Sequence, residues 1–281
     1  MADQPKPEAN VQSDVRLYTN RASYDLSAAL SILSELAVCH VAFVHPGDGK
    51  GRGETIMNIP LIAVATLDPD VPEDEVDEGE ESSWAVYLHT HKQSGLVEAV
   101  QSGIQALTAS TFHVDGMVLS PTAQDHSLDY RSATFHLDRP RIVPDTDPVG
   151  KAEKRQALAD IVDTVVGYDR TAVVGPSDDY NMSRLSLVKC KIKAVSCKQR
   201  MGGWNGGKEP VVDGPPDRGF TGVVPCWTQW GAPIGFGKDA KEVEEHFREK
   251  SLRAQRLAEG AAWASEAATL EGLGKKRTTK R

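Results

Sequence analysis

Arg131 is the side chain whose position most clearly indicates chemistry. It lies in the stretch His126–Leu137, which reads as a polar loop that turns into an alternating strand. Because side chains on a strand alternate between its two faces, Arg131 shares the apolar face with Phe135 and Leu137. A buried guanidinium needs an anionic or polar partner, since an unpaired buried charge is very costly. The residues alone leave two partners open: an internal Asp or Glu, or a bound phosphate or carboxylate.

Two other groups of polar residues could bind an anion or a metal. Lys198 and Arg200 directly follow an apolar strand, where two cations suit an anionic ligand and a solvated pair is the simpler alternative. His89 and His91 are two residues apart and would share a face if the strand before them continued. No carboxylate or cysteine is placed nearby in the sequence to complete a metal site, so we expect none.

The common signatures of phosphate binding and nucleophilic catalysis are missing from the sequence. There is no GxGxxG, no Walker loop and no GxSxG. A bound phosphate would therefore be held by scattered Arg, Lys and Ser side chains at strand ends. The four cysteines form no CxxC pair and no recognisable Cys-His pattern, which favours free, packed thiols in a reducing compartment.

Composition narrows the class of protein. The chain has 281 residues, of which 40% are hydrophobic and 26% are charged, as in ordinary soluble globular proteins. The net charge of -8 argues against a general nucleic-acid binder. No apolar run approaches the roughly 20 residues of a membrane helix, and the N-terminus lacks a signal pattern. We expect a cytoplasmic protein. The basic C-terminal residues indicate a solvated tail, with a nuclear signal as the alternative.

The elements that must position these residues are mainly strands. We expect a closed antiparallel barrel, because about six strands follow one another through hairpins and short helices, and closure removes exposed edges. Pro60 lies inside one strand, where it should cause a bulge or mark an open edge. Asp115-Gly116 between apolar runs predicts a hairpin. The expected strands are Cys39–Val44, Thr55–Leu67, Trp84–His89, Ile104–Val114, Met117–Ser120 and Leu185–Ser196.

Three helices and one insertion complete the expected organisation. Asp25–Val38 shows an apolar stripe with Asp25 as N-cap, and Gly150–Val166 places Leu158, Ile161, Val162 and Val165 inward. A long polar helix from Asp239 to about Leu270 should lie on a partner subunit or protrude. Residues 68–83 hold nine Asp or Glu between Asp68 and Glu81 and predict a solvated acidic loop between two strands. The strand Leu185–Ser196 should keep Lys189, Lys191 and Lys193 on a wet outer face.

Several segments together resemble the FMN-binding split-barrel flavoproteins of the pyridoxamine 5'-phosphate oxidase-like superfamily, in particular the nitroimidazole-resistance or flavin-nucleotide-binding branch. The resemblance covers roughly residues 16–235. The matching residues are Arg21-Ala22-Ser23-Tyr24-Asp25, Cys39 to Val44, Asn58-Ile59-Pro60-Leu61, Tyr87-Leu88-His89, Ser94, Asp125-His126-Ser127-Leu128-Asp129-Tyr130-Arg131-Ser132, Ser196-Cys197-Lys198-Gln199-Arg200 and Thr221-Gly222-Val223-Val224-Pro225.

The sequence departs from the family pattern at several positions. Thr90 replaces the usual Gly, and Asp129 replaces Asn two residues before the supposed phosphate ligand. Gly95 stands where the family often has a cation after Ser94. Either Lys92 takes the place of that cation in binding the phosphate, or the affinity for the phosphate is lower.

The resemblance implies a six-stranded antiparallel split β-barrel, mainly β with flanking helices (α+β), and a long C-terminal helix. Residues 1–20 would be a flexible segment, 21–237 the FMN-binding domain, and 238–281 the C-terminal helix and basic tail. It implies a homodimer with FMN at the subunit interface. The implied cofactor-binding residues are Asn58, Ile59, Pro60, Leu61, His89, Thr90, His91, Lys92, Ser94, Tyr130, Arg131, Ser132, Lys198 and Arg200.

The leading hypothesis is an FMN-dependent oxidoreductase that passes electrons from NADH or NADPH to a small nitro-aromatic or quinone-like acceptor. No proton-transfer residue stands out, and His91 and His126 are candidates because they flank the proposed site. A second hypothesis is a non-catalytic protein that binds flavin or haem, since neutral imidazole is a normal axial ligand of haem. A third is a true pyridoxamine 5'-phosphate oxidase.

Overall fold

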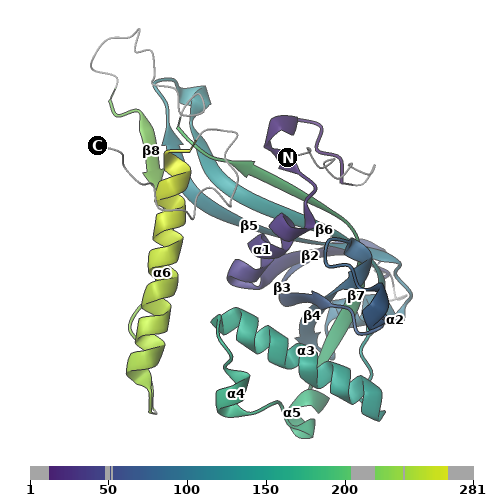
Figure 1. The fold of residues 1–281 in the computed structure, drawn as a ribbon. Helices are drawn as coiled ribbons and strands as arrows, with labels where there is room; N and C mark the ends of the chain where they lie inside the picture. The colour runs from purple at the N-terminus through teal and green to yellow at the C-terminus, as the bar shows by residue number, and fades with distance from the viewer. Residues whose placement is uncertain (1–12, 48–50, 52, 204–218, 237, 265–281) are drawn as a thin grey trace. The chain divides into compact units, whose positions relative to one another are not determined.

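The structure is a computed structural model that describes residues 13–47, 51, 53–203, 219–236 and 238–264 (Figure 1). Most of the expected N-terminal segment, the Gly- and Pro-rich stretch 204–218 and the basic C-terminal tail lie outside the described residues. The strands are β1 (Ala22–Ser23), β2 (Val38–His45), β3 (Thr55–Leu67), β4 (Trp84–His91), β5 (Ala106–Leu119), β6 (Ser127–Ile142), β7 (Leu185–Arg200) and β8 (Gly222–Pro225). The α-helices are α1 (Leu26–Leu36), α2 (Gly95–Gln101), α3 (Pro148–Val166), α4 (Thr171–Val174), α5 (Asp179–Ser183) and α6 (Ala240–Ala262).

Six strands close into the predicted antiparallel split barrel. They follow the order β7-β4-β3-β2-β5-β6, and β7 also pairs with β6, which completes the circle. The β2–β3 hairpin pairs Val38 with Ile62 and His45 with Thr55. β3 continues through Pro60 without a break and has the bounds expected from the sequence. The fold class and the presence of a long C-terminal helix are therefore confirmed.

The chain divides into two compact units. The first contains residues 1–17, 23–111 and 132–197, and the second contains residues 18–22, 112–131 and 198–281. Strands β5, β6 and β7 contribute residues to both units.

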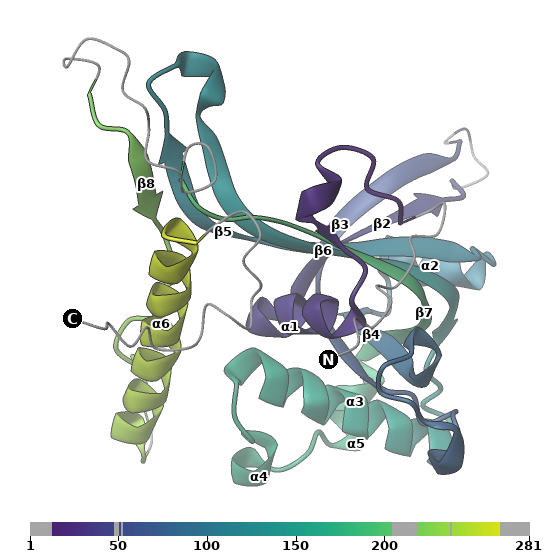
Figure 2. The same ribbon diagram turned by 45° about the horizontal axis from the view of Figure 1, so that its top comes forward.

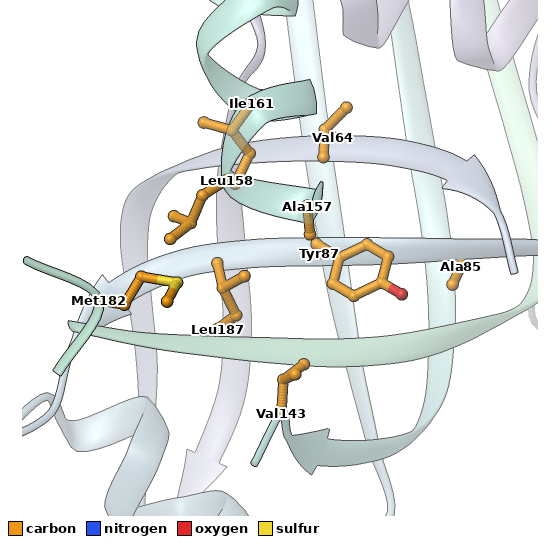
Figure 3. Packing of buried hydrophobic residues seen from close by; sticks show 9 residues of the cluster. All are labelled: Val64, Ala85, Tyr87, Val143, Ala157, Leu158, Ile161, Met182 and Leu187. Atoms are coloured by element: carbon orange, nitrogen blue, oxygen red, sulfur yellow. The ribbon is translucent and has the colours of Figure 1, made fainter. Parts of the chain in front are cut away.

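In the first unit, helices α1 and α3 lie beside each other and pack against β3 (Figures 1 and 2). α1 begins at its expected N-cap, Asp25, whose carboxylate accepts a hydrogen bond from the Ser27 backbone N–H. In α3, Leu158 and Ile161 point into the core around Tyr87, as predicted (Figure 3). The prediction was wrong for Val162 and Val165, which are exposed. The apolar stripe of α3 is narrower than its sequence indicates.

The predicted hairpin at Asp115-Gly116 is also wrong, because β5 runs through both residues as one strand. The Asp115 carboxylate is engaged by a buried arginine on β6, so it does not form a turn. Gly116 is required by close packing: a Cβ there would lie 2.8 Å from Val223 Cγ1 of the adjoining β8. The Asp115-Gly116 pair therefore lies inside a long strand, where Asp115 pairs with the buried arginine and Gly116 leaves room for β8.

The outer face of β7 is wet only in part: Lys193 is exposed as expected, but the Lys189 side chain is only 2% exposed. The Lys189 ammonium lies 2.6 Å from Asp68 Oδ1, 2.8 Å from Asp70 Oδ2 and 3.1 Å from Glu153 Oε1. The Asp68 side chain is fully buried and also pairs with Lys191. The acidic insertion connects β3 to β4 as predicted, but its first residue, Asp68, is buried against β7 and not solvated.

The pKa values of these carboxyl groups reflect the pairing. Burial acts to raise the pKa of Asp68, but hydrogen bonds from Lys189 and Lys191 outweigh it and hold the pKa below its usual range. The hydrogen bond from Lys189 is the main cause that lowers the pKa of Asp70. Asp68 and Asp70 are therefore ionised at neutral pH, in direct contact with the lysines.

Replacing Lys189 by Met should destabilise the protein by about 3 kcal/mol, because it removes the buried cation that three carboxylates share and leaves the buried Asp68 with Lys191 alone. Urea unfolding at pH 7 measures the change. Lys193 lies on the same strand and is exposed, so Lys193→Met is the matched control and should shift stability by no more than ~0.5 kcal/mol. Equal effects of the two substitutions would contradict the assignment of the buried cluster.

Candidate functional site

The first part of the candidate site is an open edge of β3 in the first unit. On one edge, Ala42 pairs with Asn58 and Cys39 pairs with Leu61. On the other edge, pairing with β4 begins only at Ile62, opposite His89. Within the described part of the chain, no strand pairs with residues 55–61 on that edge. This is the geometry that backbone contacts from Ile59, Pro60 and Leu61 to a planar ligand require.

β4 leaves β3 at this point and continues to His91, two residues beyond its expected end. Its other edge stays paired with β7 to the end, where Thr90 and His91 lie opposite Ser186 and Leu185. The side chain of His89 is half-buried, and burial lowers the pKa of its imidazole. His91 is exposed, and its Nδ1 accepts a hydrogen bond from the Gln93 backbone N–H at 3.2 Å. β4 therefore places His89 and His91 at the point where its pairing with β3 ends and the barrel opens.

Ser94 is the N-cap of α2, and its hydroxyl accepts a hydrogen bond from the Val97 backbone N–H at 3.3 Å. The predicted substitute cation, Lys92, is exposed and lies 3.2 Å from Asp145 Oδ2. Lys154 also bonds that carboxylate, at 3.0 Å. The Lys92 ammonium has three donors, so one ion pair does not exhaust it.

The structure explains why Gly95 replaces a cation. A Cβ at this position would lie 3.3 Å from His45 Cδ2, so the imidazole ring occupies the space. His45 Nε2 lies 3.1 Å from Glu98 Oε2, and its Nδ1 accepts a hydrogen bond from the Gly47 backbone N–H. With Nδ1 as acceptor, Nε2 carries the proton that bonds Glu98. The sequence reasoning missed this contact, and the glycine at an otherwise charged position was its signal.

The second unit holds Arg131, the arginine on the apolar face of its strand. Arg131 Nε donates to Asp115 Oδ2 and Arg131 Nη2 donates to Asp115 Oδ1, each at 2.8 Å. Both side chains are almost wholly buried, with 5% and 6% exposure. Of the two partners that the sequence left open, the structure contains the internal carboxylate. The predicted strand alternation is confirmed, since Arg131 and Phe135 are buried while Ser132 between them is partly exposed.

Asp129, the least expected residue of the signature, pairs with Arg200. The distance between Asp129 Oδ1 and Arg200 Nη1 is 2.5 Å, and Arg200 also donates to the carbonyl groups of Gly202 and Gly203. Oδ2 of Asp129 is buried without a hydrogen-bond partner. Burial raises the pKa of Asp129 to about 7, which outweighs the opposing effect of Arg200.

The other predicted residues are divided between the units. Ser132 belongs to the first unit, whereas Tyr130 and Lys198 belong to the second. The Lys198 ammonium lies 5.6 Å from the centre of the Tyr18 ring. His126, also in the second unit, is exposed and its Nδ1 donates to the Thr122 carbonyl at 3.0 Å. The structure thus gathers residues 58–61, His89–Lys92 and Ser94 in one unit, and their ligand contacts stay a prediction.

Other kinds of centre receive no support from the described residues. Within that part of the chain, no three His, Cys, Asp or Glu side chains form a group that could hold a metal ion. Cys39, Cys190 and Cys197 are buried free thiols, and burial raises the pKa of Cys39 and of Cys197 to about 12. None of the described helices is both long enough and apolar enough to cross a bilayer.

The closed strand order and the opening between β3 and β4 define a split-barrel protein. The family model described as pyridoxamine 5'-phosphate oxidase matches residues 25–199, well over half of the chain. The chain belongs to this family. No curated protein gives a significant match.

Two solved structures share the fold. The flavocytochrome Anf3 from Azotobacter vinelandii is 21% identical, with a TM-score of 0.60 over 84% of this chain and 98% of that chain. The FAD and heme binding protein from Mycobacterium smegmatis is 22% identical, with a TM-score of 0.57 over 78% of this chain and 90% of that chain. At such low identity, these similarities show the fold alone.

The raised pKa of Asp129 predicts a distinctive pH dependence of stability. Between its unfolded pKa of roughly 3.9 and about 7, the folded protein holds a proton that the unfolded chain releases. This contribution is complete below the unfolded pKa and is lost as the pH rises through the folded pKa. The wild-type stability minus that of Asp129→Asn should therefore fall by ~1 kcal/mol per pH unit in this window. Urea unfolding from pH 4.5 to 8 measures it. A constant difference would mean that Asp129 stays ionised beside Arg200.

Proposed function

We propose that this protein is an FMN-dependent oxidoreductase that uses NADH or NADPH to reduce a small molecule, such as a nitro-aromatic or quinone-like compound. The observation that carries the proposal is the open edge of β3 at residues 58–61. It lies where the family resemblance implies backbone contacts to the isoalloxazine ring. Membership of the family supports the same assignment.

The residues of the first unit fit a flavin phosphate. Ser94 presents a hydroxyl at the start of α2, and Lys92 keeps ammonium donors beyond its contact with Asp145. His89 is half-buried and is the last residue of β4 that pairs with β3. It precedes Lys92 and Ser94 by only a few positions in the sequence. In this proposal, the β3 edge orients the ring, and Ser94 with Lys92 holds the phosphate.

Arg131 and Arg200 fit the phosphate less well than the resemblance implies. A phosphate at Arg131 would compete with a bidentate carboxylate in a water-poor environment, where ion pairs are strong. Arg200 is held by a single contact to Asp129 and by the carbonyl groups of Gly202 and Gly203. We therefore assign these arginines to supporting the end of the barrel, and we keep Tyr130, Ser132 and Lys198 as proposed contacts at its rim.

The bound cofactor would supply the redox step, while the protein supplies binding, orientation and electrostatics. The β3 edge would fix one face of the ring and leave the other face to donor and acceptor. The exposed imidazole of His91 is the proposed proton carrier within this unit, since its Nδ1 is held by the Gln93 backbone N–H and its Nε2 faces no hydrogen-bond partner among the described residues. His126 is the alternative.

We also propose a cytoplasmic homodimer, in line with the free thiols and with the family. The second candidate function is a flavin protein that carries haem. Burial lowers the pKa of both His89 and His136, which keeps their imidazoles neutral and able to bind iron. The names of the two similar structures mention a flavocytochrome and haem. A true pyridoxamine 5'-phosphate oxidase is the third candidate.

The visible spectrum of the purified protein separates these candidates. We expect bands near roughly 375 and 450 nm, with or without added FMN, and bleaching by NADH or NADPH under anaerobic conditions. A Soret band would favour haem, and turnover of pyridoxamine 5'-phosphate would favour the third candidate. A colourless protein that takes up no FMN would overturn the proposal.

Ser94→Ala should weaken FMN binding about tenfold, because it removes a hydroxyl donor to the phosphate, and should cost about 1 kcal/mol of stability as a lost helix cap. Asp178 caps α5 by accepting from the Asn181 backbone N–H, so Asp178→Ala is the matched control. It should cost similar stability and leave the FMN dissociation constant unchanged. Flavin fluorescence titration and urea unfolding give the two readouts, and equal FMN affinities would contradict the role of Ser94.

A further inference from the structure

Lys154 of α3 is a buried cation close to the residues proposed to hold the phosphate. Its side chain is only 2% exposed, and its ammonium lies 3.0 Å from Asp145 Oδ2. The same ammonium donates a hydrogen bond to the backbone carbonyl of Leu185 at 2.9 Å. An apolar side chain of similar volume would fill this place without the cost of removing a charge from water. The charge of Lys154 therefore calls for a role beyond packing.

Both acceptors of Lys154 lie next to the turn that carries the proposed site residues. Leu185 begins β7 and pairs with His91, the last residue of β4. Asp145 Oδ2 also lies 3.2 Å from the ammonium of Lys92, which directly follows His91 in the sequence. All five residues belong to the first unit. Lys154 therefore contacts both the strand that holds the end of β4 and the carboxylate that holds the next side chain.

The three charged side chains lead from the core to the surface. Lys154 is 2% exposed, Asp145 is 28% exposed and Lys92 is 44% exposed. Because both lysines bond the same carboxylate oxygen, the two ammonium groups lie near each other. Only the outer one is open enough to meet a ligand, and the inner one reaches the ligand through the carboxylate.

The segment that carries Asp145 is fixed against α3. Asp147 is the N-cap of this helix, and its carboxylate accepts a hydrogen bond from the Gly150 backbone N–H at 2.9 Å. Gly150 packs so closely that a Cβ there would lie 2.6 Å from the carbonyl oxygen of Pro144. Asp145 is thus flanked by two anchored residues. It offers Lys92 a fixed carboxylate, which restricts an otherwise mobile side chain before any ligand arrives.

The charge balance decides whether this carboxylate helps or hinders an anion. With Lys92 alone, Asp145 would neutralise the cation that the phosphate needs. The hydrogen bond from Lys154 is instead the main cause that holds the pKa of Asp145 below its usual range, ahead of the hydrogen bond from Lys92. Two cations that share one carboxylate keep one positive charge in excess, and this charge attracts an anion.

We propose that Lys154 is a positioning residue of the phosphate subsite: through Asp145 it keeps Lys92 in place and leaves Lys92 its positive charge for the ligand. The inference rests on the proposed function, because the ligand is the flavin phosphate. Lys154 itself touches no part of the flavin. Its consequence is selectivity for a phosphorylated flavin over the same ring and side chain without phosphate.

A purely structural role is the competing explanation. In that case, Lys154 joins α3 to β7, and its loss loosens the first unit as a whole. Both roles predict lower stability when Lys154 is replaced. Only the positioning role predicts a loss that depends on whether the ligand carries a phosphate, so the test must compare two flavins.

FMN and riboflavin, which lacks the phosphate, provide this comparison by fluorescence titration. Wild type should bind FMN about 100-fold more tightly than riboflavin, and Lys154→Met should reduce this preference about tenfold. Lys151 lies on the same helix, is 39% exposed and pairs with Asp179, so Lys151→Met is the matched control that should keep the preference. If Lys154→Met weakens both flavins in the same proportion, the positioning role is wrong.

A double-mutant cycle tests whether Lys154 acts through Lys92. Lys92→Met alone should lower the preference for FMN at least as much as Lys154→Met does. Adding Lys154→Met to Lys92→Met should then change the preference no further, because the intermediary is already missing. A second, equal loss in the double variant would mean that Lys154 acts on the phosphate independently of Lys92, against the proposal.

A variant without the buried pair guards against misfolding of Lys154→Met. Asp145→Asn combined with Lys154→Met leaves no unpaired buried charge, so it should fold better than Lys154→Met alone. Lys92 keeps its charge in this variant but loses its anchor, and the preference for FMN should fall about threefold. An undiminished preference in the folded double variant would overturn the inference.

The wild-type measurements separate this inference from the proposed function. A wild type that binds neither flavin overturns the proposed function, and the inference falls with it. A wild type that binds both flavins equally well keeps the flavin assignment and overturns the inference alone.

Discussion

An ammonium group removed from water needs carboxylates within hydrogen-bonding distance, and Lys189 imposes this constraint on the barrel. It lies in the middle of β7 with three carboxylates around it, from the start of the acidic insertion and from α3. Glu153 also accepts a hydrogen bond from the Tyr87 hydroxyl and pairs with Arg141. The buried cation and Glu153 thereby tie three strands (β4, β6 and β7), one helix and one loop together. At the start of the acidic insertion, Asp68 and Asp70 neutralise lysines of β7. The rest of the insertion is a solvated loop.

Strand alternation was the most informative property of the sequence. It predicted the buried face of β6 correctly, because the period of two depends only on which side of a sheet faces the core. It failed for β7, where Lys189 has the expected face but the wrong environment. The pattern reports on which side a residue lies and carries no information on what covers that side. Here Lys189 is covered by Asp70, which is 119 positions away in the sequence, by Asp68 beside it, and by Glu153 of α3.

The Asp115-Gly116 pair failed for a related reason. An aspartate followed by glycine is a strong turn signal when both side chains have only local partners. Here Asp115 neutralises Arg131 and Gly116 admits β8. The sequence established that Arg131 needed a partner, and the physical argument for an internal carboxylate was available from the start. Nothing in a single sequence distinguishes which of 40 acidic residues supplies it.

The His45 imidazole and Gly95 couple the end of β2 to the turn before α2. A Cβ at position 95 would lie 3.3 Å from His45 Cδ2, so a side chain there would require the ring to move by a few tenths of an ångström. The ring is held on both nitrogens, by the Gly47 backbone N–H and by Glu98, so this movement would disturb both contacts. A substitution in the turn would therefore be felt at the end of β2, about 50 positions earlier in the sequence.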